Sequence, residues 1–295
     1  MAKLFPLSRA GMLVRNEHPD YGHALQAEDA AVVGAAAADE VERYLALRPD
    51  HVPTPLYTLP GLARELGIGS IHLKDESPRL GLGSFKALGG SYAVIRLVLE
   101  AAERQLGRPV DMAEFQTPGI RAVAAGLTFG CATDGNHGRS VAAGAQMVGA
   151  RAAIFVHKGV SPQRVTAIQR RGAEVILVPG SYDDAVAEAS RRCAEEKWTV
   201  LSDTSWPGYE RIPGLVMQGY TVLLREALRA LREMPTHVFV QAGVGGLAAT
   251  VAGHLAETLG ESRPSFIVVE PARAACVLES ARAGARCISR MGRQP

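Results

Sequence analysis

The sequence predicts an α/β fold in which parallel sheets are covered on both faces by helices. From residue 146 onward, short apolar segments typical of buried strands alternate with amphipathic segments typical of helices, at the rhythm of βαβ units. The chain has 295 residues, of which 47% are hydrophobic and 21% charged. This length is more than one core usually supports, so we expect two domains or one large α/β domain.

The expected elements follow in chain order. A strand ends at Lys74, and a glycine-rich loop leads from it to a helix that begins near Lys86. Further strands are expected at the end of 146–156 and at 173–179, 199–202, 236–243 and 265–271. Helices are expected at 161–171, from 181 onward and at 219–232. Ser161 and Ser181 suit N-cap positions, and Pro162 suits the first helical position.

Composition narrows the class of protein. The net charge of +2, from 32 basic and 30 acidic residues, is too balanced to suggest a nucleic-acid or membrane partner. The four cysteines form no CxxC pair, which indicates reduced thiols in a cytoplasmic protein, with Cys131 and Cys276 read as small buried side chains. The N-terminus has no sustained apolar stretch typical of a signal peptide. The eight histidines show no metal-binding spacing, so no metal site is expected.

The first segment with a chemical signature runs from Ser70 to Gly90. It places Lys86 at or beside the start of a helix with a largely apolar face, where the helix dipole disfavours an ammonium. A partly desolvated lysine in this position suits imine formation with a carbonyl cofactor. A surface lysine on a helix is the alternative interpretation of this segment alone.

The second segment, ATDGNHGRSVAAGAQ at 132–146, brackets Asn136 and His137 between two glycines. Backbone N–H groups at such a turn form a concavity suited to a carboxylate. The Asn136 amide can hydrogen-bond a ring hydroxyl without adding a charge. A tight turn with an N-cap is the structural alternative.

The third segment, VQAGVGGLAATVAG at 240–253, runs from a buried strand through glycines into a small-residue helix. Glycines let the backbone approach a phosphate at the helix N-terminus. The segment lacks the GK[ST] of a nucleotide-binding P-loop and fits GxGxxG poorly, so a dinucleotide is the weaker interpretation. The three segments together provide an imine-forming lysine, a carboxylate-binding turn and a phosphate cup.

Their order and context resemble the fold-type II enzymes that use pyridoxal 5'-phosphate (PLP), the group of tryptophan synthase β and threonine dehydratase. Within that group the chain is most similar to the diaminopropionate ammonia-lyases. The resemblance extends to about Ser280 and rests most on KDES at 74–77, RLGLGSFKALGG, ATDGNHGRSVA, DTSWPGYE at 203–210 and QAGVGGLAA. Threonine dehydratases usually follow SFK with an arginine-glycine pair and carry a serine-rich turn. The ALGG after Lys86 and the Thr133–Asp134 pair favour the ammonia-lyase branch.

The resemblance implies a cofactor, a reaction and a set of site residues. PLP is expected on Lys86 as a Schiff base, held by Phe85, Asn136, Gly243, Val244, Gly245, Gly246 and Leu247. The implied reaction releases ammonia from 2,3-diaminopropionate and yields pyruvate, with Lys86 and Asp134 as bases on opposite faces. Asp203, Thr133 and Gly135 are expected to bind the substrate, and Asp134 and Asp203 can pair its extra ammonium. A homodimer is the family expectation.

The resemblance also implies how the chain is divided into domains, and two other functions stay open beside the lyase. The fold implies two doubly wound parallel-sheet domains, a large cofactor-binding domain from 1–90 and 205–295 and a small α/β domain from 91–204. The resemblance ends in an arginine-rich tail, so we expect the large domain to be incomplete, as in a shortened or frame-shifted lyase. An inactive remnant of the lyase is therefore one alternative. A serine or threonine dehydratase, or a β-replacement enzyme of the same fold, is the other.

Overall fold

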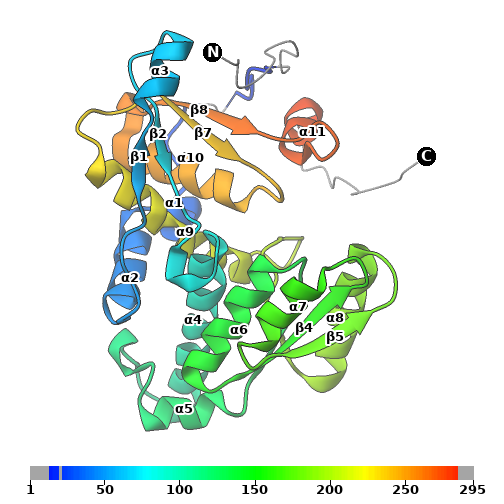
Figure 1. Ribbon diagram of the computed structural model, residues 1–295. Helices are drawn as coiled ribbons and strands as arrows, with labels where there is room; N and C mark the ends of the chain where they lie inside the picture. Colours follow the sequence, from blue (N-terminus) through cyan, green and yellow to red (C-terminus); the bar gives the residue numbers. More distant parts are fainter. Residues whose placement is uncertain (1–12, 20–21, 285–295) are drawn as a thin grey trace.

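The structure is a computed structural model that describes residues 13–19 and 22–284 (Figure 1). Expectations about the first twelve residues, Cys287 and the tail after Gly284 lie outside the described residues. The strands are β1 (Leu56–Thr58), β2 (His72–Lys74), β3 (Thr128–Ala132), β4 (Arg151–His157), β5 (Glu174–Val178), β6 (Thr199–Val200), β7 (His237–Gln241) and β8 (Ser265–Val269). The α-helices are α1 (Ala27–Val33), α2 (Ala35–Ala46), α3 (Pro60–Leu66), α4 (Lys86–Leu106), α5 (Pro118–Ala124), α6 (Asn136–Val148), α7 (Pro162–Gln169), α8 (Tyr182–Glu196), α9 (Arg211–Ala230), α10 (Gly246–Leu259) and α11 (Cys276–Ala283). Single 3₁₀ turns cover Arg79–Gly81, Met112–Glu114 and Gly260–Ser262.

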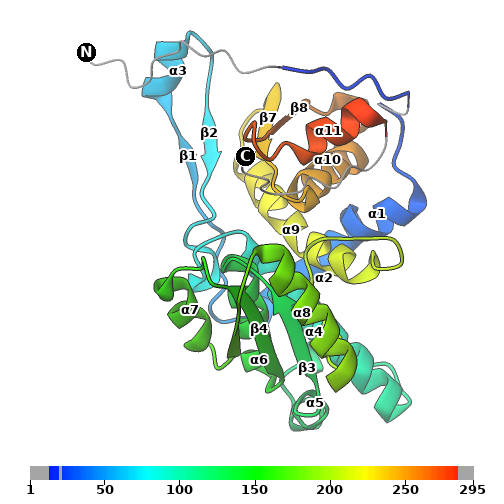
Figure 2. The same cartoon turned by 90° about the vertical axis from the view of Figure 1, so that its right-hand side faces the viewer.

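The strands form three sheets. Four parallel strands in the order β5-β4-β3-β6 make the largest sheet, and β7 pairs with β8 in parallel. The strands β1 and β2 form an antiparallel pair, which with α3 stands apart from the β7–β8 region in Figure 2. Two parallel sheets in an α/β chain confirm the fold class expected from the alternating pattern. The division into a large and a small domain stays a prediction.

The helix N-caps differ in how they use their side chains. Ser181 accepts a hydrogen bond from the Asp184 N–H, and the Asp184 carboxylate accepts one from the Ser181 N–H, so α8 begins with a full capping box. Ser161 has the extended backbone of an N-cap, but its side chain makes no capping bond to α7. Pro162 occupies the first turn of α7, as the sequence predicts.

The helix expected at 219–232 is longer than predicted. The structure starts α9 at Arg211, eight residues earlier, with Pro213 and Gly214 inside its first turns. Proline is tolerated in the first turn because the N–H groups there have no intrahelical acceptor. A start of α9 at Arg211 is therefore compatible with Pro213.

The central element is α4, which contacts α6 and α9 along its length. A Cβ added at Gly89 would lie 2.5 Å from the Val216 carbonyl oxygen, and one added at Gly219 would lie 2.7 Å from the Leu88 carbonyl oxygen. The glycines of ALGG therefore permit a close crossing of α4 and α9. At Gly90 a Cβ would approach the Ser140 hydroxyl of α6 at 2.7 Å. Small residues thus fix the first turns of α4, where Lys86 lies.

The described residues form four clusters of buried apolar side chains, two of which include residues of α9. The main one surrounds α4 and includes Tyr44, Tyr92 and Phe115, whose rings contact one another at centroid distances of 5.8 Å. A smaller core joins β7, β8, α9 and α10 through Leu224, Val240 and Val251. Across residues 13–19 and 22–284, no helix is both long enough and apolar enough to cross a bilayer.

Candidate active site

Three loops with polar residues leave the four-stranded sheet at the carboxyl ends of its strands. β3 leads into Thr133 and Asp134, β4 ends at His157, and Asp203 follows three residues after the end of β6. Because the strands are parallel, these ends share one edge of the sheet, which is where open α/β sheets bind ligands. The described residues contain no group of three His, Cys, Asp or Glu side chains that could hold a metal ion.

Lys86, the first residue of α4, faces this edge. Its Nζ donates a hydrogen bond to Oδ2 of Asp203, a residue 117 positions away in the sequence. The Lys86 side chain is 30% exposed and that of Asp203 only 10%. The sequence assigned Asp203 to the substrate ammonium, and in the structure this carboxylate pairs with the lysine ammonium instead.

His137 lies behind this pair. Its Nε2 is 3.0 Å from the Leu201 carbonyl oxygen, and its Nδ1 is 3.9 Å from Asp203 Oδ2. Burial lowers the pKa of His137, so the imidazole is neutral at pH 7. Burial alone would raise the pKa of Asp203, but the positive charges of His137, once protonated in acid, and of Lys86 lower it to about 2. Asp203 therefore stays ionised at every physiological pH.

The role of Asp134 as a second base stays a prediction. Its side chain is 52% exposed, and Oδ1 lies 3.0 Å from Nε2 of His157 at the end of β4. The Arg164 guanidinium donates to its backbone carbonyl at 3.2 Å. No direct contact joins Asp134 to Lys86 among the described residues. Asp134 is thus at the correct edge of the sheet, held by a histidine that the sequence analysis did not single out.

The turn between β3 and α6 is fixed by its own threonine. The buried Thr133 hydroxyl accepts hydrogen bonds from the N–H groups of Gly135 at 3.0 Å and Gly138 at 3.2 Å. These two N–H groups, expected to face a carboxylate, are used inside the turn. Gly135 has φ +144°, which only glycine adopts readily. Asn136 begins α6, and its side-chain oxygen accepts from Arg139 at 3.1 Å.

The glycine-rich segment lies between β7 and α10. Gly245 is the N-cap of α10 with φ +91°, and both Gly243 and Gly246 have room for approach, since an added Cβ would meet nothing closer than Met217 Cγ at 3.6 Å. The thiol of Cys276 donates to the Gly243 carbonyl at 2.8 Å. Cys276 is only half-buried, so the expectation of a fully buried residue was wrong there, while Cys131 is buried as expected. Leu247 packs against both cores.

The helix α9 connects the lysine to the glycine segment. It contacts α4 on one side and α10 on the other. The Phe85 ring, next to Lys86, meets the ring of Tyr220 on α9 edge-on at 5.0 Å. Met217, one turn earlier, contacts Gly246, and its carbonyl accepts from Thr250 of α10 at 3.2 Å.

Three further residues contribute to the site. Ser84 and Tyr182 were not singled out in the sequence, whereas Tyr209 lies in the DTSWPGYE segment on which the resemblance rests. The Ser84 hydroxyl, two residues before Lys86, is buried without a hydrogen-bond partner. Burial raises the pKa of Tyr182, and the charges of Asp203 and Asp134 raise it further. The Tyr209 hydroxyl donates to the Val200 carbonyl at 2.8 Å and accepts from the Ser202 N–H, which anchors the loop carrying Asp203. A residue's position just after a strand at the carboxyl edge is the one sequence signal that indicates Tyr182.

These features fit PLP. An orphaned buried hydroxyl at Ser84 and the unpartnered Nδ1 of His137 are polar atoms that a polar ligand can satisfy. The segment from Gly243 to Gly246 leaves space at the start of α10, where N–H groups and the helix dipole favour a phosphate. Lys86 supplies the amine for a carbonyl cofactor.

Comparisons with known proteins agree with this chemistry. A diaminopropionate ammonia-lyase of Salmonella typhimurium is 44% identical over 237 residues, which are 79% of this chain and 58% of that protein. The Escherichia coli diaminopropionate ammonia-lyase is 41% identical over 232 residues, 77% of this chain and 57% of the relative. The chain thus spans somewhat more than half the length of these relatives.

Solved structures give the same result. The Escherichia coli diaminopropionate ammonia-lyase in complex with an aminoacrylate–PLP azomethine intermediate superimposes with a TM-score of 0.78 at 35% identity, covering 88% of this chain and 66% of that one. Tomato threonine deaminase isoform 2 superimposes with a TM-score of 0.67 at 20% identity, which shows the shared fold. The family model described as "Pyridoxal-phosphate dependent enzyme" matches residues 47–291. Because this match covers most of the chain, the chain belongs to the family of pyridoxal-phosphate-dependent enzymes.

Proposed function

We propose that the chain eliminates ammonia from 2,3-diaminopropionate to yield pyruvate and ammonia, with PLP as cofactor. The observation that carries the proposal is the Lys86–Asp203 pair at the carboxyl edge of the sheet. Lys86 would hold the cofactor, and with its ammonium so engaged the Asp203 carboxylate would be available as a partner for an ammonium of the substrate. A substrate with two ammonium groups suits a site with two carboxylates, Asp203 and Asp134. The similarity to diaminopropionate ammonia-lyases supports the same substrate.

The residues expected to hold PLP are Lys86, Phe85, Asn136 and the run from Gly243 to Leu247. Bound there, the cofactor supplies an electron sink that acidifies the Cα proton of an attached amino acid. The protein supplies the proton acceptors and the orientation. Lys86 Nζ accepts the Cα proton on one face of the amino acid, and Asp203 orients the amino acid. On the other face Asp134, paired with His157, can accept a proton or bind the departing β-ammonium.

Asp203 and His137 each keep a single protonation state at neutral pH. While it is paired with Lys86, Asp203 has a pKa lowered to about 2 and is therefore a carboxylate that can accept an ammonium of the substrate. The neutral His137 fills the space behind it without adding a charge, and its Nε2 is bonded to the Leu201 carbonyl. Lys86 and Asp134 are left as the groups that exchange protons.

A spectroscopic titration with a pyruvate assay tests this function. PLP added to the purified chain should produce the visible absorption band of a lysine imine, and Lys86→Ala should abolish it. Lys158→Ala, which removes an exposed lysine next to the end of β4, should leave the band unchanged. Added 2,3-diaminopropionate should then yield pyruvate, measured with lactate dehydrogenase and NADH. Pyruvate from serine but not from the diamine would favour a dehydratase, and a folded protein without the band would contradict the proposal.

Two finer expectations, a homodimer and a cytoplasmic location, remain predictions. Sedimentation equilibrium of the purified chain measures the first, and cell fractionation of the source organism measures the second. A monomer at micromolar concentration would argue against the dimer.

A further inference from the structure

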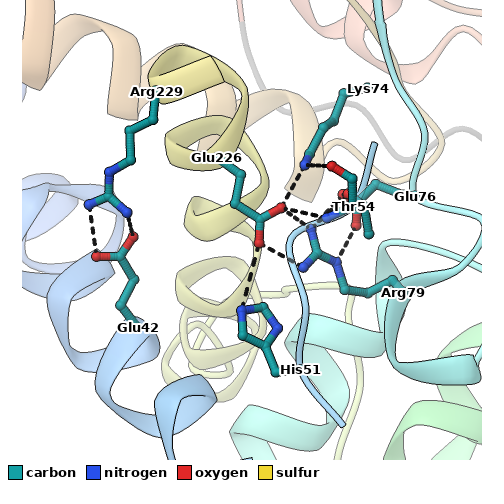
Figure 3. Close-up of polar contacts among 8 residues, drawn as sticks. All are labelled: Glu42, His51, Thr54, Lys74, Glu76, Arg79, Glu226 and Arg229. Atoms are coloured by element: carbon teal, nitrogen blue, oxygen red, sulfur yellow. Dashed lines mark hydrogen bonds and ion pairs between the residues drawn. The ribbon is translucent and has the colours of Figure 1, made fainter. Parts of the chain in front are cut away.

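A buried cluster of charges lies between the end of β2 and α9, outside the residues assigned to the reaction (Figure 3). Arg79 is fully buried, and its Nη1 and Nη2 donate to the two carboxylate oxygens of Glu226 at 2.8 and 2.7 Å. Its Nε and Nη2 also donate to Glu76 at 2.8 and 2.7 Å. Lys74 Nζ donates to Glu226 at 2.6 Å and to the Thr54 carbonyl at 2.7 Å. Two cations and two carboxylates therefore balance in one hydrogen-bonded network.

Burying this cluster costs free energy, because its charged groups lose their contact with water. The side chains of Glu226 and Lys74 are 7% and 12% exposed, so these charges are nearly removed from water. Burial raises the pKa of Glu226, but hydrogen bonds from Arg79 and Lys74 outweigh this and lower it, so the carboxylate stays charged. Buried ion pairs are often no more stabilising than apolar side chains of similar size, and their best-attested role is to specify one arrangement. A positional role is the alternative to a purely stabilising one.

The cluster adjoins the loop that leads to Lys86. Lys74 ends β2, and Arg79 opens the 3₁₀ turn from which residues 82–85 run to Lys86. Leu80 in this turn has φ 49°, a left-handed conformation that is strained for leucine. Such strain persists only where the surroundings determine the backbone strongly. The guanidinium of Arg79, held on both sides by carboxylates, supplies that constraint.

One helix holds both ends of the loop. Tyr220 on α9 contacts the ring of Phe85 at the end next to Lys86, and Gly219 permits α9 to lie against Leu88 in the first turn of α4. Glu226, six residues further along α9, holds Arg79 at the other end. The loop that delivers Lys86 is therefore spanned by a single rigid element.

We propose that Glu226 is a positioning residue for Lys86, acting through Arg79 to fix the loop that sets the lysine against Asp203. Its effect on cofactor binding rests on the proposed function, whereas its effect on the loop does not. If Glu226 only stabilised the fold, replacing it would affect the loop before Lys86 no more than replacing the carboxylate of another ion pair of α9.

The same helix provides a matched control. Glu42 of α2 accepts hydrogen bonds from Arg229 at 2.6 and 3.0 Å and from Arg225 at 3.0 Å, so it also ties α9 to another segment (Figure 3). None of these hydrogen bonds reaches residues 74–86. Glu226→Gln and Glu42→Gln therefore each remove one carboxylate charge from a contact of α9, and only the first touches the loop.

Amide hydrogen exchange of the cofactor-free chain is the first measurement. Glu226→Gln should speed exchange in residues 79–86 about tenfold, while peptides of the α4 interior stay at the wild-type rate. Glu42→Gln should leave residues 79–86 unchanged. Wild-type exchange there in Glu226→Gln, or an equal acceleration in both variants, would overturn the proposal.

A second variant covers the case in which Glu226→Gln does not fold. Lys74→Met combined with Glu226→Gln removes one cation and one carboxylate, so the buried charge stays balanced. Arg79 then keeps the Glu76 carboxylate but loses its charged two-oxygen acceptor on α9. The same acceleration at residues 79–86 is expected. An unchanged rate in the folded double variant would contradict the proposal.

Cofactor affinity is the second readout. In the PLP titration, Glu226→Gln should weaken the apparent affinity about tenfold and Glu42→Gln should not, because preorganisation of the lysine depends on its supporting residues. Equal affinity in both variants would overturn the role of Glu226. A wild-type chain without an imine band would count against the proposed function, and the exchange data would still decide the loop.

Discussion

At the scale of single residues, the pair formed by Lys86 and Asp203 dominates the electrostatics of the site. The folded-state pKa of Asp203 is about 2, below its ordinary value of 3.8, so the folded protein favours the ionised carboxylate. The resulting stability is fully present above about pH 4 and is lost as the pH falls through 2.

Asp203→Asn should therefore lower the free energy of unfolding by about 2 kcal/mol at pH 7, because one pKa unit corresponds to about 1.4 kcal/mol. The difference from wild type should shrink steadily between about pH 4 and pH 2. Urea denaturation at several pH values measures it. Asp134→Asn is the control, since that carboxylate is half-exposed and should change stability by less than about 0.5 kcal/mol. A pH-independent loss in Asp203→Asn would contradict the linkage.

The sequence predicted the positions of single residues correctly where a short motif determines them. Lys86 begins a helix as expected, and Gly245 sits at the start of α10, because both positions follow from short motifs. The partner of each side chain was less accessible. Asp203 meets Lys86 across 117 residues, and Asp134 meets His157 from the neighbouring strand. Such contacts depend on how strands are ordered in the sheet, which no local pattern specifies.

At the scale of elements, the crossing of α4 and α9 depends on the absence of side chains. Gly219→Ala places a Cβ 2.7 Å from the Leu88 carbonyl oxygen and 2.8 Å from Gly89 Cα, which is backbone that cannot rotate away. We expect a loss of about 1–3 kcal/mol in the free energy of unfolding, measured by urea denaturation. Gly61→Ala in α3, where nothing lies within 4 Å, should leave stability unchanged or raise it slightly. Equal effects of the two substitutions would show that the crossing is not tight.

Element types were more predictable than element ends. The strands β5, β7 and β8 lie within the expected segments, and β4 runs one residue past the end of its segment, because apolar runs bounded by turn residues are local signals. The predicted start of α9 was eight residues too late, and the structure places Pro213 in the first turn of the helix, which tolerates proline. The strand expected to end at Lys74 is confirmed by β2, whereas its three-residue partner β1 was not predicted.

At the scale of the whole molecule, the two parallel sheets differ in completeness. In the four-stranded sheet, β3 is buried almost throughout. The described part of the second sheet has two strands, β7 and β8. Parallel sheets are ordinarily covered on both faces. Side chains of Val240 and Phe266 pack into the second core, whereas Phe239 and Val269 point to the opposite face and remain 68% and 50% exposed.

We expect this exposed face of the second sheet to limit the solubility of the protein. Phe239 is opposite Ile267 in the strand pairing, so an aromatic ring and a branched aliphatic chain adjoin on a water-facing pleat. Apolar surface of this kind makes a protein precipitate at low concentrations of sulfate, which is excluded from protein surfaces. Phe239→Thr should raise the ammonium sulfate concentration at half-precipitation, and Val52→Thr, at a lone exposed valine, should move it less. If both move it equally, single exposed residues rather than the sheet face limit how concentrated this protein can be kept.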